Sequence, residues 1–210
     1  MKKSIVLLVS LLFITAISAL ILKNLDDTNT YMKEQNHKLN KAQLMMIINN
    51  AQIEASKVIK KYSDDIPSLE DVPFSIKEVD ILLSLSLYDK YDINVYDDKT
   101  KKIDNKKYEK LQKFFWDNSV DGFENFVYLL KGNQNIKNSK QLDDIITTVI
   151  KQTYSNKILE IKDELGFIST DSNSKLYELN LKVKYLKNMA KAYYILDKDG
   201  EVKYFELSFK

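Results

Sequence analysis

The chain has 210 residues, no cysteine and a formal net charge of +2, with 32 basic residues against 30 acidic ones. The absence of cysteine excludes a disulfide framework, thiol catalysis and cysteine-based metal sites. Every basic residue is a lysine, and acids balance them, so the composition offers neither the clustered basic surface nor the arginine forks typical of nucleic-acid binding.

The first 66 residues contain neither glycine nor proline, and we expect one long helix there. Residues 5–22 are uncharged and follow Lys2 and Lys3; as a helix they would cover roughly 27 Å, close to the ~30 Å of a bilayer core. We therefore predict that residues 1–22 form a cytoplasmic leader and a transmembrane helix, with the rest of the chain exported. The alternative is a signal peptide cleaved after Ala19, but the apolar run continues past that point, which favours a retained anchor.

Residues 23–66 are predicted to form an amphipathic stalk that becomes a spine for the following domain. One apolar residue recurs every seven positions, at Leu25, Met32, Leu39, Met46 and Ile53. The intervening heptad positions are mostly polar, which indicates a projecting rod rather than a self-sufficient coiled coil. From Leu44 onward the apolar face widens, as it does in a helix packed on a core. The single histidine, His37, lies among polar residues, where catalysis or metal binding is not expected.

Residues 67–210 are predicted to form an extracytoplasmic head that begins at the chain breakers Pro67 and Pro73. Residues 81–87 alternate apolar and polar side chains, and residues 91–95 repeat the pattern. This alternation favours two strands joined as a hairpin, although a helix over residues 75–87 is an open alternative.

In the rest of the head, the spacing of the apolar residues changes twice. From about residue 105 to 166 the apolar spacing is helical, and the clearest helix begins at Ser139, which we expect to cap it. Over about 176–209 the alternation returns, which predicts a three-stranded antiparallel meander around a D-G turn. The apolar face of this sheet needs a cover, and the second half of the stalk helix is the natural candidate. The predicted fold class is therefore α+β.

The chemistry-bearing motifs are few. Asp197, Asp199 and Glu201 surround a turn that resembles the start of a calcium loop, so calcium is the one cofactor the sequence suggests, and a hairpin turn is the favoured interpretation. The chain has no nucleophile elbow, no glycine-rich loop and no histidine or acidic cluster with ligand spacing. We therefore predict a non-enzymatic protein, without catalytic or cofactor-binding residues.

Two stretches carry a resemblance to a known family. The start, KKSIVLLVSLLFITAISALILKNL, and the end, YELNLKVKYLKNMAKAYYILDKDGEVKYFELSF, resemble type IV pilin-like proteins, and among them the K-type minor pseudopilins of type II secretion systems. A helical insertion between strands would match residues 105–166. The family's processing junction corresponds to Lys3 and Ser4, where the family's glycine is absent, and its usual glutamate corresponds to Leu8.

The resemblance implies a function in assembly. It implies a single-pass protein of the bacterial inner membrane with a cytoplasmic N-terminus and a periplasmic head, which primes or caps a short extracytoplasmic fibre. The expected partners are other pilin-like subunits, an inner-membrane assembly platform and the bilayer around residues 5–22. Helix packing is expected through one set of apolar residues: Leu7, Leu8, Leu11, Leu12, Leu25, Met32 and Leu39. The alternative is a membrane-anchored periplasmic sensor or ligand-binding module.

Overall fold

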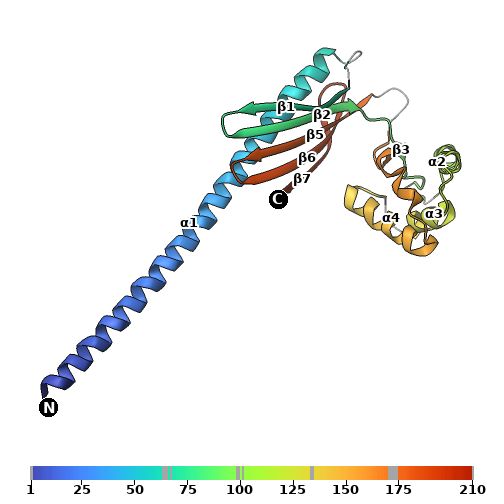
Figure 1. The fold of residues 1–210 in the computed structure, drawn as a ribbon. Helices are drawn as coiled ribbons and strands as arrows, with labels where there is room; N and C mark the ends of the chain where they lie inside the picture. Colours follow the sequence, from blue (N-terminus) through green and yellow to red (C-terminus); the bar gives the residue numbers. More distant parts are fainter. Residues whose placement is uncertain are drawn as a thin grey trace.

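The computed structural model describes residues 2–62, 66, 68–97, 100, 102–132, 135–169 and 175–209, and the side chains of residues 2–17, 19 and 132 fall outside this description. Helix α1 (Lys2–Tyr62) is a single helix of 61 residues. At a rise of ~1.5 Å per residue it extends over about 90 Å, because nothing in its sequence breaks the helix. Figure 1 shows its N-terminal half projecting from the rest of the molecule.

A five-stranded antiparallel sheet lies across the C-terminal half of α1 (Figure 1). Its strands run in the order β1-β2-β5-β6-β7. They are β1 (Leu69–Ile76), β2 (Val79–Leu87), β5 (Leu176–Tyr185), β6 (Asn188–Asp197) and β7 (Val202–Phe209). The alternation of β5 and β6 buries one face of each strand, as the sequence pattern requires.

The core between α1 and the sheet forms from the widened apolar face of the helix. Leu44, Ile48 and Ile59 are buried, and they belong to one cluster with the inward-facing residues of the central strands. That cluster includes Leu179, Leu181, Val183, Ala190 and Ala192. The short side chains of β6 let the helix approach the sheet closely, so the second half of α1 is the cover that the meander needs.

The chain between β2 and β5 forms a second, mainly helical part at one end of the sheet (Figure 1). It contains α2 (Asn105–Asp117), α3 (Phe123–Gly132), α4 (Ser139–Thr153) and the short 3-10 helices η1 (Lys157–Leu159) and η2 (Lys162–Glu164). Strands β3 (Tyr91–Asp92) and β4 (Leu165–Gly166) pair in parallel and close it. Its aromatic and aliphatic residues form a core separate from that of the sheet, centred on Phe115, Phe126 and Ile146.

The α+β class is confirmed, with a long N-terminal helix, an antiparallel sheet and accompanying helices. The hairpin predicted between residues 81–87 and 91–95 is wrong. Strand β2 pairs instead with β1, through a turn at residues 77–78, while β3 pairs with β4. We missed β1 because Pro73 interrupts it; proline is tolerated there because β1 is an edge strand.

The predicted cap of α4 is displaced by one residue. The side chain of Asn138, rather than that of Ser139, accepts the backbone N–H of Gln141 at 2.9 Å. Asparagine and serine are comparable N-caps, so composition alone does not choose between adjacent positions.

Candidate functional site

The side of α1 that faces away from the sheet carries a line of exposed apolar residues, here called the seam. Its members recur every seven positions and are between 41% and 61% exposed: Leu25, Met32, Leu39, Met46 and Ile53. At 3.6 residues per turn, seven residues almost complete two turns, so these side chains follow one another along a single face. The seam continues to Ile53, so it extends along the part of α1 whose opposite face is buried by the sheet at Leu44 and Ile48.

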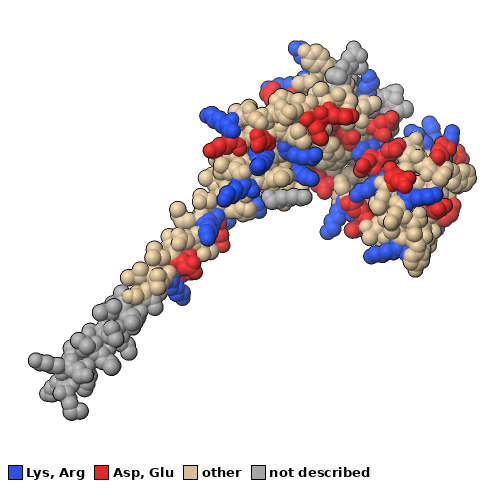
Figure 2. Space-filling model, in the orientation of Figure 1, with Lys and Arg blue, Asp and Glu red and all other residues tan. Residues whose placement is uncertain are grey.

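Charged residues are absent from the seam's face. At about 100° per residue, every Asp, Glu and Lys between residues 24 and 53 lies roughly 100° or more around α1 from the seam. Asp26, Lys33 and Lys38 lie on its flanks, and Asp27, Glu34 and Lys41 lie on the opposite side. In the view of Figure 2, the charged side chains that are visible on the projecting segment lie along one side of the rod. The polar residues beside the seam are amides and a hydroxyl, such as Thr28, Gln35 and Asn49.

Of the predicted helix-packing residues, Leu25, Met32 and Leu39 therefore lie together on this face. The other four, Leu7, Leu8, Leu11 and Leu12, and the processing positions Lys3 and Ser4, have side chains outside the described residues. Within the described part of the chain, no helix is both long and apolar enough to cross a membrane. Most side chains of the predicted span, residues 5–22, lie outside that description, so its role stays a prediction.

The turn that resembles a calcium loop fastens the sheet to α1. Gly200 has a φ of +74°, and its carbonyl accepts the Ser56 hydroxyl at 2.9 Å. The Asp197 carboxylate accepts the backbone N–H groups of Asp199 and Glu201, each at 2.9 Å, as in an Asx-type turn. These contacts explain the aspartate and the glycine as turn residues.

The electrostatics of the turn support the same interpretation. The Lys203 Nζ lies 2.8 Å from Asp197 Oδ2 and 3.0 Å from a carboxylate oxygen of Glu201. Burial opposes ionisation of Asp197, but Lys203 and the backbone N–H groups outweigh it, so the pKa of this carboxyl is lowered. Among the described residues, no three acids or histidines are grouped to hold a metal ion. Calcium binding stays a prediction without a defined ligand set.

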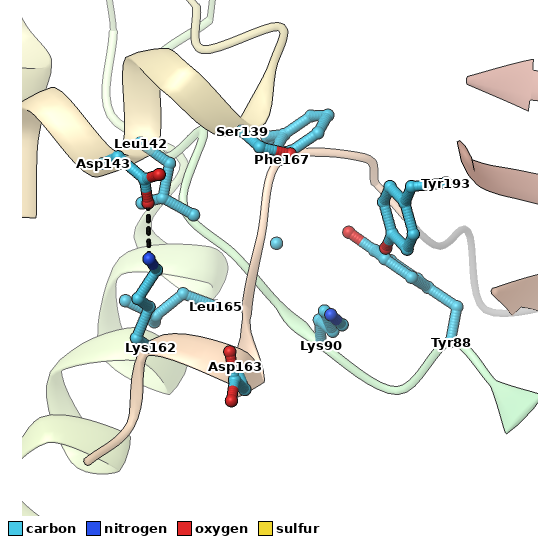
Figure 3. A pocket seen from close by; sticks show the side chains of 11 residues that line it. Tyr88, Lys90, Ser139, Leu142, Asp143, Lys162, Asp163, Leu165, Phe167 and Tyr193 are labelled. Carbon is cyan, nitrogen blue, oxygen red and sulfur yellow. Dashed lines mark ion pairs between the residues drawn. The ribbon is translucent and has the colours of Figure 1, made fainter. Parts of the chain in front are cut away.

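A hollow of about 220 Å³ lies where the helical part meets the outer face of the sheet. Figure 3 shows Tyr88, Lys90 and Tyr193 on one side of it, and Asp143 and Lys162 on the other. Lys162 Nζ lies 2.7 Å from Asp143 Oδ1. The lysines that line the hollow are thus ion-paired within the protein, since Lys90 pairs with Glu178.

Glu178 on β5 is the centre of a polar cluster that includes Lys90 and Tyr193, two residues that line the hollow. Its carboxylate accepts the Tyr193 hydroxyl at 3.0 Å and the Ser86 hydroxyl at 3.2 Å, and Lys90 Nζ lies 3.0 Å away. The Lys90 ammonium also lies over the rings of Tyr88 and Tyr193, 5.8 Å and 5.7 Å from their centroids. The cluster ties the first residues of the helical part to the sheet.

Burial governs the acidity of the two tyrosines. It raises the pKa of Tyr88 to about 12, with smaller contributions from the carboxylates of Asp92 and Glu178. Burial and then Glu178 raise the pKa of Tyr193 well above its ordinary value. Both hydroxyls therefore stay protonated at neutral pH and act as fixed donors or acceptors. The sequence did not reveal this cluster, because Lys90 and Glu178 are separated by more than eighty positions.

Gly166 lets the helical part approach the sheet. A Cβ there would collide with the hydroxyl of Tyr88 and would lie 2.8 Å from Cβ of Lys90. The Tyr88 hydroxyl also accepts the backbone N–H of Ile168, at 3.4 Å. The contacts among the described residues therefore hold the helical part against the sheet, and the hollow lies at this junction.

Comparisons with protein-family models, with curated proteins and with solved structures found no match for this chain. Functional inference therefore depends on the residues and geometry described above.

Proposed function

We propose that the protein is a non-enzymatic, pilin-like or minor-pseudopilin-like subunit of a type II secretion or type IV pilus-type assembly. In this proposal residues 5–22 anchor it in the bacterial inner membrane, with the N-terminus in the cytoplasm and the head in the periplasm. The subunit primes or caps a short extracytoplasmic fibre together with other pilin-like subunits and an inner-membrane platform.

The observation that carries the proposal is the seam on α1. Five large apolar side chains share one uncharged face over almost thirty residues, yet nothing in the described part of the chain covers them. A solvated rod gains nothing from keeping its charges off one face, and isolated helices derive little stability from propensity alone. A neighbouring helix that covers the seam accounts for both features.

The composition of the face also indicates the kind of neighbour. Leucine and methionine alternate with residues such as Thr28, Gln35 and Asn49, so the face is too polar for a tight two-stranded coiled coil. These features support packing among several uncharged helices, as expected in a fibre core.

A charge placed on the seam tests this function. The double substitution Leu39→Lys and Met46→Lys changes two side chains that are 57% and 61% exposed, so the head should fold normally. Burying two ammonium groups between helices is unfavourable, so detergent-solubilised membranes should contain at least about tenfold less of the assembled complex on native gels.

The matched control is Asp27→Lys with Glu34→Lys, which places two lysines on the face of α1 opposite the seam. It should leave the assembled fraction unchanged. An assembled fraction that is the same in the seam variant as in the unsubstituted protein would contradict the proposal.

A further inference from the structure

The end of the sheet that faces the N-terminal half of α1 forms a second exposed surface, here called the hairpin rim. It consists of the β1–β2 turn, the β5–β6 turn and the end of β7. The turns are adjacent, because the backbone N–H of Leu186 donates to the Glu78 carbonyl at 3.5 Å. Lys41 Nζ lies 5.3 Å from the ring centroid of Phe209, which places the end of β7, and with it this end of the sheet, beside residue 41 of α1.

The rim combines exposed apolar side chains with unpaired lysines. The apolar members are Ile76 at 67% exposure, Leu186 at 45%, Met189 at 37% and Phe209 at 37%. Four exposed lysines surround them, none ion-paired with any described residue: Lys77, Lys184, Lys187 and Lys191. Glu78 and Asp80 are the acids between them, so the surface is net positive. Apolar patches rimmed by polar groups mark interaction sites.

The backbone of the β5–β6 turn gives an independent indication. Leu186 has a φ of +54°, a left-handed conformation that favours glycine or asparagine in two-residue hairpin turns. A leucine there strains the backbone and exposes an apolar side chain as well. Strain that local structure does not require points to a role for the side chain itself.

The distance of the hairpin rim from the bilayer shows whether a lipid or a protein is the partner that it can contact. Lys41 lies 19 positions after Leu22, the end of the predicted span, so the rim stands roughly 28 Å along the helix from the bilayer core. The headgroup layer on each side is only ~5–7 Å deep. An upright helix therefore holds the rim clear of the membrane and leaves space beneath it for protein.

We propose that the hairpin rim docks on the head of a neighbouring membrane-tethered subunit, at an apolar surface surrounded by aspartate and glutamate. The lysines select acidic partners by charge complementarity, and the apolar side chains supply buried contact area. The inference rests on the proposed function, since it requires neighbours that are held at the same membrane.

The test uses the full chain in its own cells, with a photoreactive phenylalanine analogue in place of Ile76. We expect crosslinks to one protein, at a peptide that contains acidic residues. Lys184→Glu with Lys187→Glu should lower the crosslink yield about tenfold, while Lys187→Arg should keep it. Crosslinks to lipid, or to a peptide without acids, would overturn the inference.

Leu186→Asn separates docking from folding. Asparagine suits the turn better than leucine, so the melting temperature should stay equal or rise, yet the yield from position 76 should fall several-fold. An unchanged yield in this variant would also overturn the inference.

A probe at Leu39 distinguishes the two proposals. Crosslinks from 39 but not from 76 reject the rim alone, whereas no crosslinks from 39 reject the proposed function.

Discussion

Replacement of Leu44 by alanine tests whether the second half of α1 is an integral part of the head. Leu44 is fully buried against the sheet, whereas Leu39, five residues earlier on the same helix, is 57% exposed. Leucine to alanine removes three carbons, worth about 2.4 kcal/mol at ~0.8 kcal/mol each, and the cavity that remains adds to this loss. We expect Leu44→Ala to lower the free energy of unfolding by about 3–4 kcal/mol and Leu39→Ala by less than ~0.5 kcal/mol.

Urea unfolding of the detergent-solubilised chain measures this difference. The near-ultraviolet circular dichroism of tyrosines reports on the right core, because Tyr177 and Tyr194 are buried in the same cluster as Leu44. With a denaturant slope of ~2 kcal/mol/M, Leu44→Ala should move the midpoint down by about 1.5–2 M. Equal midpoints for the two variants would refute the assignment of α1 as the cover of the sheet.

Two further predictions concern the junction between the sheet and the helical part. Gly166→Ala should lower the melting temperature by about 4–8 °C in a thermal scan, because the new methyl group would displace Tyr88 at a cost of ~2 kcal/mol; an unchanged melting temperature would contradict this close approach. In an ultraviolet titration Tyr88 should ionise near its raised pKa of about 12. Because the folded-state pKa lies above the unfolded value of 10.0, the contribution of Tyr88 to stability is complete below pH ~10 and is lost as the pH rises towards 12. Tyr88→Phe should reduce this fall in the free energy of unfolding between pH 10 and 12. A fall as steep in the variant as in the unsubstituted protein would contradict the prediction.

Local patterns were sufficient for the long helix and the meander. The absence of glycine and proline through residue 66 leaves the helix uninterrupted, and the widening apolar face from Leu44 marks where it becomes buried. The alternation in β5 and β6 fixes both strands and their buried face, because a slip of one residue would expose the whole apolar set. These signals are contained within a few turns or a few strand positions of the chain.

Features that depend on distant residues could not be predicted in this way. Strand β1 has little alternation because most of its residues are exposed at the edge of the sheet, and it contains Pro73. The cluster around Glu178 joins residues from β2, the following loop, β5 and β6, and no local spacing connects them. The seam was visible as a seven-residue repeat, but only the position of the sheet shows that it lies on the uncovered side of α1.

The most direct test of the account is crosslinking from the two faces of the projecting helix in native membranes. Photoreactive side chains are placed one at a time at Leu39, on the seam, and at Glu34, on the opposite side of α1 and within two turns of Leu39. The account predicts crosslinks from Leu39 to the helices of other membrane-tethered, pilin-like subunits, and few or none from Glu34. Equal crosslinking from the two positions, or a chain that remains uncrosslinked at both, would contradict it.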